Sequence, residues 1–172
     1  DKIVLLVMNA EGYGNIMKLM KRFYLDNTEK GWAPQLTLQN LKDFNAGLIA
    51  LTAGPEGTIG RLLLENRKQE AEDFTLKLKE IFHMEISRIG TEKERLTEEA
   101  FIDLAYKYDI PLVATNEVFF LDEDMYEAHD ALVCISAGEY VANENRRKFS
   151  INNRLRSEAE MVELFSDLPE AV

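Results

Sequence analysis

The stretch PLVATNEVFFLDEDMYEAHDALVCISAG, residues 111–138, contains the change of pattern that decides the fold. A short apolar run, Pro111 to Ala114, breaks into the polar triplet Thr-Asn-Glu, returns to Val-Phe-Phe, and then opens a long amphipathic segment that ends at Gly138. This pattern is typical of a buried strand whose end delivers polar groups to the mouth of an α/β sheet or barrel, where chemistry usually takes place. The stretch therefore predicts the edge of an active site, either a working one or one that has lost its function.

Three further apolar runs indicate strands, and helical patterns lie between them. The expected strands are 3–8, 48–52, 83–89 and 112–114, and the first is continuously apolar, as in a strand that is covered on both faces. Strands that alternate with helices predict an α/β fold with a parallel sheet or part of a (β/α) barrel. Four strands are too few to close a barrel.

The helices are predicted from apolar residues at spacings of three or four and from capping residues. Gly12-Tyr13-Gly14 is expected to form a turn before the first helix, and Trp32-Ala33-Pro34 is expected to break the chain. A short helix is expected over 37–44 with Thr37 as its cap, and a helical hairpin or one bent helix is expected beyond Gly54-Pro55, with a pattern that extends to Phe82. Two further helices are expected over 96–108 and over 123–136, and Gly138 stops the second of them. The last helix is expected after Ser157, where Glu160 completes a capping box.

The composition indicates one globular domain that is strongly acidic. The 172 residues are 46% hydrophobic, and 20 basic against 31 acidic side chains give a net charge of −11, which repels nucleic acid unless positive charge is concentrated locally. The basic cluster of the sequence is Arg146, Arg147 and Lys148, with Arg154 and Arg156 close behind. We interpret this segment, Arg146 to Arg156, as a solvated connector, with contact to an acidic partner or a phosphate as the alternative.

The cysteine content and the hydropathy indicate the cellular setting. Cys134 is the single cysteine, so an intrachain disulfide is excluded, a reducing cytoplasm is the expected location, and a packed core thiol is the expected role. Apolar runs stay well below the ~18 residues of a membrane span, so no membrane partner is expected. The chain opens with Asp1-Lys2 directly before a strand and has no initiator methionine, so we expect an internal piece of a larger protein.

Few side chains offer metal or catalytic chemistry. The two histidines, His83 and His129, have no partner at ligand spacing. We expect His83 to hydrogen-bond a loop, and His129 to be a surface or packing residue of a helix. The glycine-rich segment 54–60 lacks the lysine of a P-loop and is expected to be a strand-to-helix turn. Glu85 inside the third strand and Glu117 after the fourth can share a proton or a metal if their strands are neighbours.

Four segments together resemble the PHP (polymerase and histidinol phosphatase) domains of bacterial DNA polymerase III alpha subunits. They are LLVMNAEGYGN at 5–15, GLIALTAG at 47–54, VATNEVFFL at 113–121 and RSEAEMVELF at 156–165. The resemblance runs over essentially the whole chain in the right order. It implies part of a distorted (β/α)7 barrel whose N-terminal strands lie upstream of Asp1, so that residues 1–172 form the middle and C-terminal part of a PHP domain.

The same resemblance locates the positions at which relatives bind metal. A histidine expected just before Gly90 is Ile89 here, and an Asp-x-His pair is Glu117-Val118-Phe119. Because hydrocarbon replaces two imidazoles, the resemblance implies vestigial ligand positions at Ile89, Glu117 and Phe119, and neither a metal nor a catalytic or cofactor-binding residue in this chain.

The function that the resemblance implies belongs to a replicative DNA polymerase, which uses magnesium in a palm domain outside this chain. This segment is then expected to be an inactive platform that docks the proofreading exonuclease among the replicase subunits, with DNA bound mainly elsewhere. The alternative is a live metal-dependent phosphoesterase or 3'-5' exonuclease. A piece of a barrel also exposes the edges of 3–8 and of at least one other strand, so we expect the isolated chain to form dimers or larger species through them, or to rearrange its ends to cover them.

Overall fold

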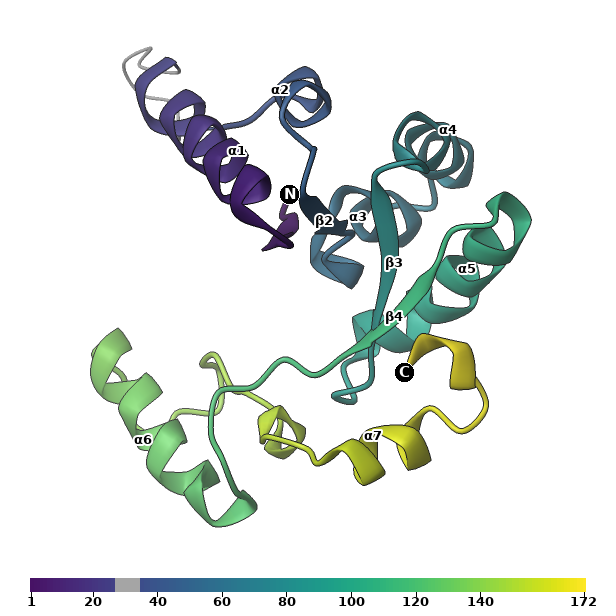
Figure 1. The fold of residues 1–172 in the computed structure, drawn as a ribbon. Coiled ribbons are helices and arrows are strands. Elements are labelled where there is room, and N and C mark those ends of the chain that lie inside the picture. Colours follow the sequence, from purple (N-terminus) through teal and green to yellow (C-terminus); the bar gives the residue numbers. More distant parts are fainter. Residues whose placement is uncertain (27–34) are drawn as a thin grey trace.

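The structure, a computed structural model, describes residues 1–26 and 35–172 and has a mixed α/β fold around a four-stranded sheet (Figure 1). The strands lie side by side in the order of the chain: β1 (Val4–Val7), β2 (Leu48–Leu51), β3 (Phe82–Ser87) and β4 (Leu112–Thr115). The pairs β2–β3 and β3–β4 are parallel, as predicted. The expectation of a parallel sheet is wrong for β1, which runs antiparallel to β2. The Met8 N–H donates to the Gly47 carbonyl (2.9 Å), so the chain enters β2 at the end where it leaves β1.

The helices follow the predicted order, and capping side chains explain where several begin. They are α1 (Ala10–Lys21), continued by a π-helical turn Arg22–Asp26, α2 (Leu38–Asp43), α3 (Thr58–Leu64), α4 (Lys68–Leu78), α5 (Glu92–Tyr108), α6 (Tyr126–Ala137) and α7 (Glu158–Leu164), with 3-10 turns at Gly54–Glu56, Glu123–Met125, Ile151–Asn153 and Pro169–Ala171. Thr37 caps α2 and Ser157 with Glu160 forms the capping box of α7, which confirms both caps. Trp32-Ala33-Pro34 lies outside the described residues.

Two predicted boundaries are wrong. Gly12 and Gly14 lie inside α1, because Asn9 caps this helix by accepting the Gly12 N–H (2.9 Å). A Cβ at Gly12 would lie 1.8 Å from the Gly47 carbonyl oxygen, so glycine serves the close approach of α1 to β2. The helical pattern predicted to extend to Phe82 ends with α4 at Leu78, and Phe82 opens β3. The hairpin alternative is confirmed, because α3 and α4 are separate helices.

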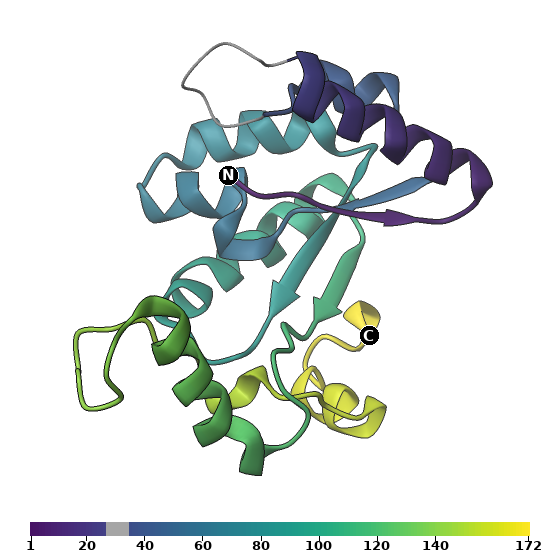
Figure 2. The same cartoon turned by 90° about the vertical axis from the view of Figure 1, so that its left-hand side faces the viewer.

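The described hydrophobic core has two clusters that share one face of β3, since Phe82 belongs to one of them and Met84 and Ile86 to the other. The larger one joins α3, α4, α5 and the C-terminal segment to β3 and β4, and Phe101 and Phe165 are almost fully buried in it. The smaller one joins α1, α2 and α4 to β2 through Leu19, Leu41 and Leu78. Figure 2 shows the C-terminal 3-10 turn beside β4, where it closes the larger cluster.

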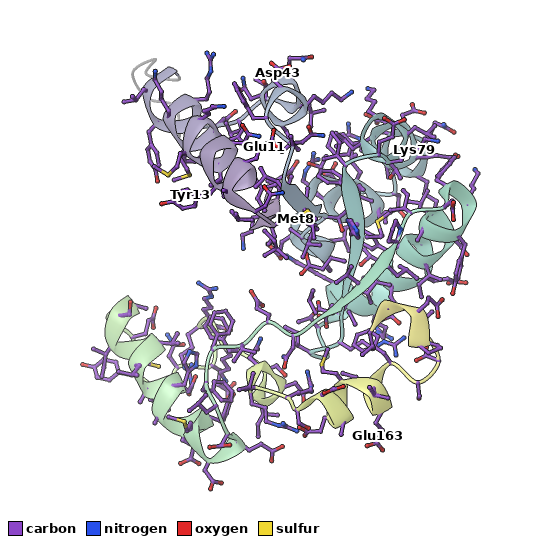
Figure 3. All side chains as sticks on the ribbon, in the orientation of Figure 1. Met8, Glu11, Tyr13, Asp43, Lys79 and Glu163 are labelled. Carbon is purple, nitrogen blue, oxygen red and sulfur yellow. The ribbon has the colours of Figure 1, made fainter. Side chains whose placement is uncertain are left out.

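The sequence predicts that the first strand is covered on both faces, and this prediction is wrong. Val4, Leu6 and Val7 are 37%, 47% and 43% exposed. The reason is that β1 is an edge strand, which pairs with β2 alone, and Tyr13 on the helix that follows it lies on the side of α1 away from α2 (Figure 3). The continuous apolar run therefore predicts the strand correctly, but it does not predict whether other elements cover its faces.

The described helices are at most 17 residues long. Within residues 1–26 and 35–172, none of them combines the length and the apolar content that crossing a bilayer requires.

Candidate functional site

A pocket of about 480 Å³ that is lined by several charged side chains lies at the carboxyl ends of the three parallel strands. It is lined by residues in or just after the last parts of β2, β3 and β4 and by the first turn of α5: Ala53 to Glu56, Glu85, Ser87, Ile89, Thr91 to Glu94 and Thr115 to Glu117, with Lys2 and Val4 from the N-terminal segment. This is the place at which the stretch 111–138 predicts an active-site edge. A larger cavity of about 650 Å³ between β1 and α2 has Asp1 as its one acidic lining residue, whereas the pocket at the strand ends gathers five glutamates, so the strand-end pocket is the candidate site.

Glu85 and Glu117, which the sequence pairs conditionally, do line this one pocket, because β3 and β4 are neighbours. The Glu85 carboxylate accepts a hydrogen bond from the Thr115 hydroxyl (2.8 Å) through Oε1. Its other oxygen, Oε2, is buried and has no partner among the described residues. Glu117 is exposed. The pair therefore combines one half-satisfied carboxylate with one solvated carboxylate.

A second buried carboxylate, Glu94, is a site residue that the sequence reasoning missed. It is 6% exposed and belongs to the capping box of α5 with Thr91. It accepts the Ser87 hydroxyl (2.6 Å) and the backbone N–H groups of Gly90 (2.9 Å) and Thr91 (2.8 Å). Both carboxylate oxygens are thus committed to holding the end of β3 against the start of α5. The pattern Thr-x-x-Glu at 91–94 is the signal from which it can be found.

The mouth of the pocket carries one ion pair between its walls. The Lys93 ammonium lies 2.7 Å from the Glu56 carboxylate. The hydrogen bond from Lys93 holds the pKa of Glu56 below its ordinary value. Glu56 is therefore a charged, partnered group at neutral pH, and it is not free to act as a general acid.

The three expected vestigial positions lie around this pocket and present no imidazole to it. Ile89 is buried (7% exposed) and lines the pocket. Phe119 is 41% exposed, and its ring packs on Phe149 (centroids 4.4 Å apart) and stacks with His129 (5.8 Å). Phe119 thus belongs to an aromatic cluster beside the pocket.

A short turn, Ser150 to Asn153, joins the ends of β3 and β4, and we call it the 150–153 clamp. At the β3 side, the carbonyl of Ile89 accepts the Ser150 hydroxyl (2.8 Å) and the Asn152 side-chain amide (3.2 Å). At the β4 side, the Asn153 side chain donates to the Glu117 carbonyl (2.9 Å), and the Asn153 carbonyl accepts the Phe119 N–H (2.8 Å).

Asn153 is the centre of this clamp. It is 1% exposed, and its side-chain oxygen also accepts the Ser150 N–H (2.9 Å). The oxygen and the nitrogen of the Asn153 side-chain amide are thus both hydrogen-bonded within the protein. The two strand ends whose ligand positions are Ile89 and Phe119 are therefore cross-linked by hydrogen bonds from one turn.

Histidine and cysteine do not add ligands to the pocket. His129 packs among Phe119, Phe120 and Phe149, as the packing interpretation predicts. Cys134 is 3% exposed, which confirms the packed core thiol. In the described part of the chain, no three side chains of the His, Cys, Asp and Glu types are grouped as metal ligands. Ile89 and the stacked Phe119 ring leave a donor set that does not fit a multi-metal cluster.

The basic cluster differs from the expected solvated connector. Arg146 is bidentate on Asp130 (both 2.5 Å), its side chain is 5% exposed, and it holds the pKa of Asp130 below the ordinary value. Arg154 bridges Glu123 and Glu160, and its hydrogen bond lowers the pKa of Glu160 to about 2. These arginines find their acidic partners inside the chain, because the segment folds back against α6 and α7.

Of the remaining members, Arg147 makes a ring contact and Arg156 a backbone hydrogen bond, whereas Lys148 is exposed. The Arg147 guanidinium lies 4.6 Å from the centre of the Phe149 ring, which is a cation–π contact. The Arg156 N–H donates to the Asn116 side chain (3.1 Å), and burial lowers the pKa of the Arg156 guanidinium. The segment therefore packs on the pocket's flank through Arg146, Arg154 and Arg156, while Arg147 and Lys148 remain exposed.

Comparison with known proteins agrees with this architecture. The PHP domain family matches residues 1–89. The chain is 41% identical over 99% of its length to DNA polymerase III subunit alpha of Rickettsia bellii, 34% identical over 98% to that of Caulobacter vibrioides, and 36% identical over 100% to that of Pseudomonas aeruginosa. It spans about 15% of the length of each of these relatives. The chain therefore belongs to the PHP domain family.

Proposed function

We propose that this chain is the middle and C-terminal part of the PHP domain of a bacterial replicative DNA polymerase, and that it acts there as a metal-free structural platform. The similarity to DNA polymerase III alpha subunits over 98–100% of the chain supports the parent protein. The observation that carries the platform role is the 150–153 clamp, which joins Ile89 and Phe119 through hydrogen bonds.

In this proposal the clamp holds the strand ends together, which is the structural role that a metal cluster has in a PHP site that binds metal. A metal holds strand ends together by binding a ligand from each of them. Here the Asn153 side chain and the Ser150 hydroxyl hold the same ends, with each hydrogen bond contributing about 1 kcal/mol. Ile89, Glu117 and Phe119 are then vestigial ligand positions, and the rigid pocket wall is the part of the site that persists.

The parent polymerase would elongate DNA with two magnesium ions held by carboxylates outside this chain. This segment would perform no nucleotidyl transfer, and it would give the polymerase a rigid surface for the proofreading exonuclease and the other replicase subunits. Template-directed extension of a primer tests the first part. The product of the complete gene should extend the primer, and the 172-residue chain should not exceed a mock preparation. Extension by the 172-residue chain would contradict the proposal.

A second candidate, a metal-dependent phosphoesterase or 3'-5' exonuclease, is favoured by one specific observation. The buried Oε2 of Glu85 has no described partner and lies in the same pocket as the exposed Glu117. Carboxylates in this arrangement can hold a divalent ion if further ligands come from elsewhere in the polypeptide.

Elemental analysis separates the two candidates. The complete gene product is washed with a chelator, dialysed against zinc and manganese, and compared with Glu85→Gln. The platform proposal expects substoichiometric metal in both proteins and no hydrolysis of a phosphodiester. One or more metals per chain, lost together with hydrolysis in Glu85→Gln, would establish the second candidate in its place.

A further inference from the structure

Helix α6 is apolar on two opposite sides, and the described chain covers one of them. The covered side carries His129, which packs among phenylalanines, Cys134, which is buried, and Asp130, which pairs with Arg146. The Tyr126 hydroxyl also donates to the Phe149 carbonyl (3.2 Å) on this side. These contacts attach α6 to the rest of the fold.

The uncovered side is a stripe of four apolar residues, which we call the α6 stripe: Met125, Ala128, Leu132 and Ile135. Their spacing of three, four and three residues places them on one face of a helix. Met125, Leu132 and Ile135 are 44%, 63% and 76% exposed, and Ala128 is exposed as well. In Figures 1 and 2, α6 lies at the margin of the molecule, joined to it by extended segments on either side. A helix that is apolar on both sides is normally buried between two partners.

The charges around the stripe specify the chemistry of the missing partner. No lysine or arginine occurs between Lys107 and Arg146, and the exposed side chains next to the stripe, Asp124 and Glu127, are acidic. Arg146, the first base after α6, is used by Asp130 on the covered side. The uncovered face is thus an apolar seam with acidic side chains beside its N-terminal end. Pairing with the same face of a second copy would bring like charges together, which disfavours that arrangement.

We propose that the α6 stripe docks an amphipathic helix whose apolar seam is flanked by lysine or arginine, and that this helix lies in another segment of the same longer polypeptide. Charge complementarity gives the flanks. The length of the relatives gives the source, because the chain spans about 15% of them and the remaining polypeptide is tethered at high local concentration. The proposal rests on the proposed function in that it requires a longer parent chain, and it names the surface by which the platform joins that parent.

A pair of probe peptides tests the chemistry of the partner. Two synthetic helices share leucine at heptad positions, and one carries lysine and the other glutamate on both flanks. The 172-residue chain should bind the lysine peptide about tenfold or more tightly than the glutamate peptide at low salt. Leu132→Asp should weaken that binding by about tenfold or more, whereas Leu96→Asp should not, because Leu96 is equally exposed (63%) but lies on α5. Equal binding of both peptides, or an equal effect of both substitutions, would overturn the proposal.

Photo-cross-linking tests the source of the partner. A photoreactive amino acid is placed at position 132 or, as the matched control, at position 96 of the complete gene product. Position 132 should give an intrachain cross-link to a basic amphipathic segment outside residues 1–172, and position 96 should not. A cross-link to a second copy or to a separate protein, or none at all, would contradict the proposal. Metal content and primer extension do not depend on α6, so failure here leaves the proposed function standing.

Discussion

Helices α5 and α6 show two ways in which a helix of this protein is stabilised. α5 begins at a complete capping box formed by Thr91 and Glu94 and buries Phe101 in the larger core cluster. α6 begins at Tyr126, where Met125 provides no side-chain cap, and its Leu132 and Ile135 remain exposed. The difference teaches that α5 finds its partners within the described chain, whereas α6 finds only some of its partners there.

The largest expected difference between the two helices is the cost of removing an apolar side chain. Phe101 is 2% exposed, so Phe101→Ala should lower the free energy of unfolding by about 3–5 kcal/mol. Leu132 is 63% exposed, so Leu132→Ala should change it by less than about 0.5 kcal/mol in the 172-residue chain. Urea unfolding followed by circular dichroism measures both. A large loss in Leu132→Ala would mean that α6 is already buried in solution.

The 150–153 clamp should produce the next largest effect. Asn153→Ala removes the bonds to Glu117 and Ser150 and leaves two polar backbone groups without partners, which should cost about 2–3 kcal/mol. Asn152→Ala is the matched control, because Asn152 makes one longer bond to Ile89, whose carbonyl keeps the Ser150 hydroxyl. The control should cost about 1 kcal/mol or less. Equal losses would show that the clamp is not centred on Asn153.

The capping box of α5 should contribute a smaller amount. Thr91→Ala removes the hydroxyl that accepts the Glu94 N–H and should cost about 1 kcal/mol. Thr91→Ser keeps a hydroxyl at the same place and should restore most of the stability. Helix α6 has no side-chain cap, so this loss of capping energy can be measured on α5 and has no counterpart on α6. Urea midpoints of the three proteins decide the point, and a Ser variant as unstable as the Ala variant would speak against capping.

The acid side of the stability curve should show the smallest change. Arg88 pairs with Asp167 (2.6 Å) and with Glu98 on α5 (2.6 Å), and it holds the pKa of Asp167 at about 2. A carboxylate whose pKa is lower in the folded state stabilises the protein above its unfolded pKa of ~3.9, and this contribution is lost as the pH falls toward 2. Arg88→Met should flatten that part of the curve. Thermal unfolding between pH 2 and 5 provides the measurement, and an unchanged slope would remove Asp167 from the account.

Much of the fold can be predicted from the sequence because its signals are local. The runs 48–52, 83–89 and 112–114 correspond to β2, β3 and β4 within one or two residues at each end, since each is apolar and flanked by turn or helix signals. The caps at Thr37 and Ser157 are equally local. The direction and exposure of β1 are not local, because they depend on the bond from Met8 to Gly47 and on what lies beside an edge strand.

The candidate site is harder to predict for the same reason. The sequence brings Glu85 and Glu117 together only on the condition that their strands are neighbours, and the strand order of the structure fulfils this condition. The clamp joins Ser150 to Ile89 and Asn153 to Glu117 across 61 and 36 residues, and no spacing rule relates such pairs. The pairing of Arg146 with Asp130 is likewise a consequence of how the polar segment folds back on α6.

The central claim is that hydrogen bonds, and not a metal, hold the ends of β3 and β4 together. Thermal unfolding of the 172-residue chain and of Asn153→Ala, each with a chelator and with 1 mM manganese or zinc (roughly 100-fold or more above the dissociation constant of a functional site), tests it most directly. The account predicts that metal leaves the unfolding temperature of the unaltered chain unchanged, while Asn153→Ala lowers it under all conditions. A rise in the unfolding temperature of the unaltered chain on adding metal, abolished by Glu85→Gln, would contradict it.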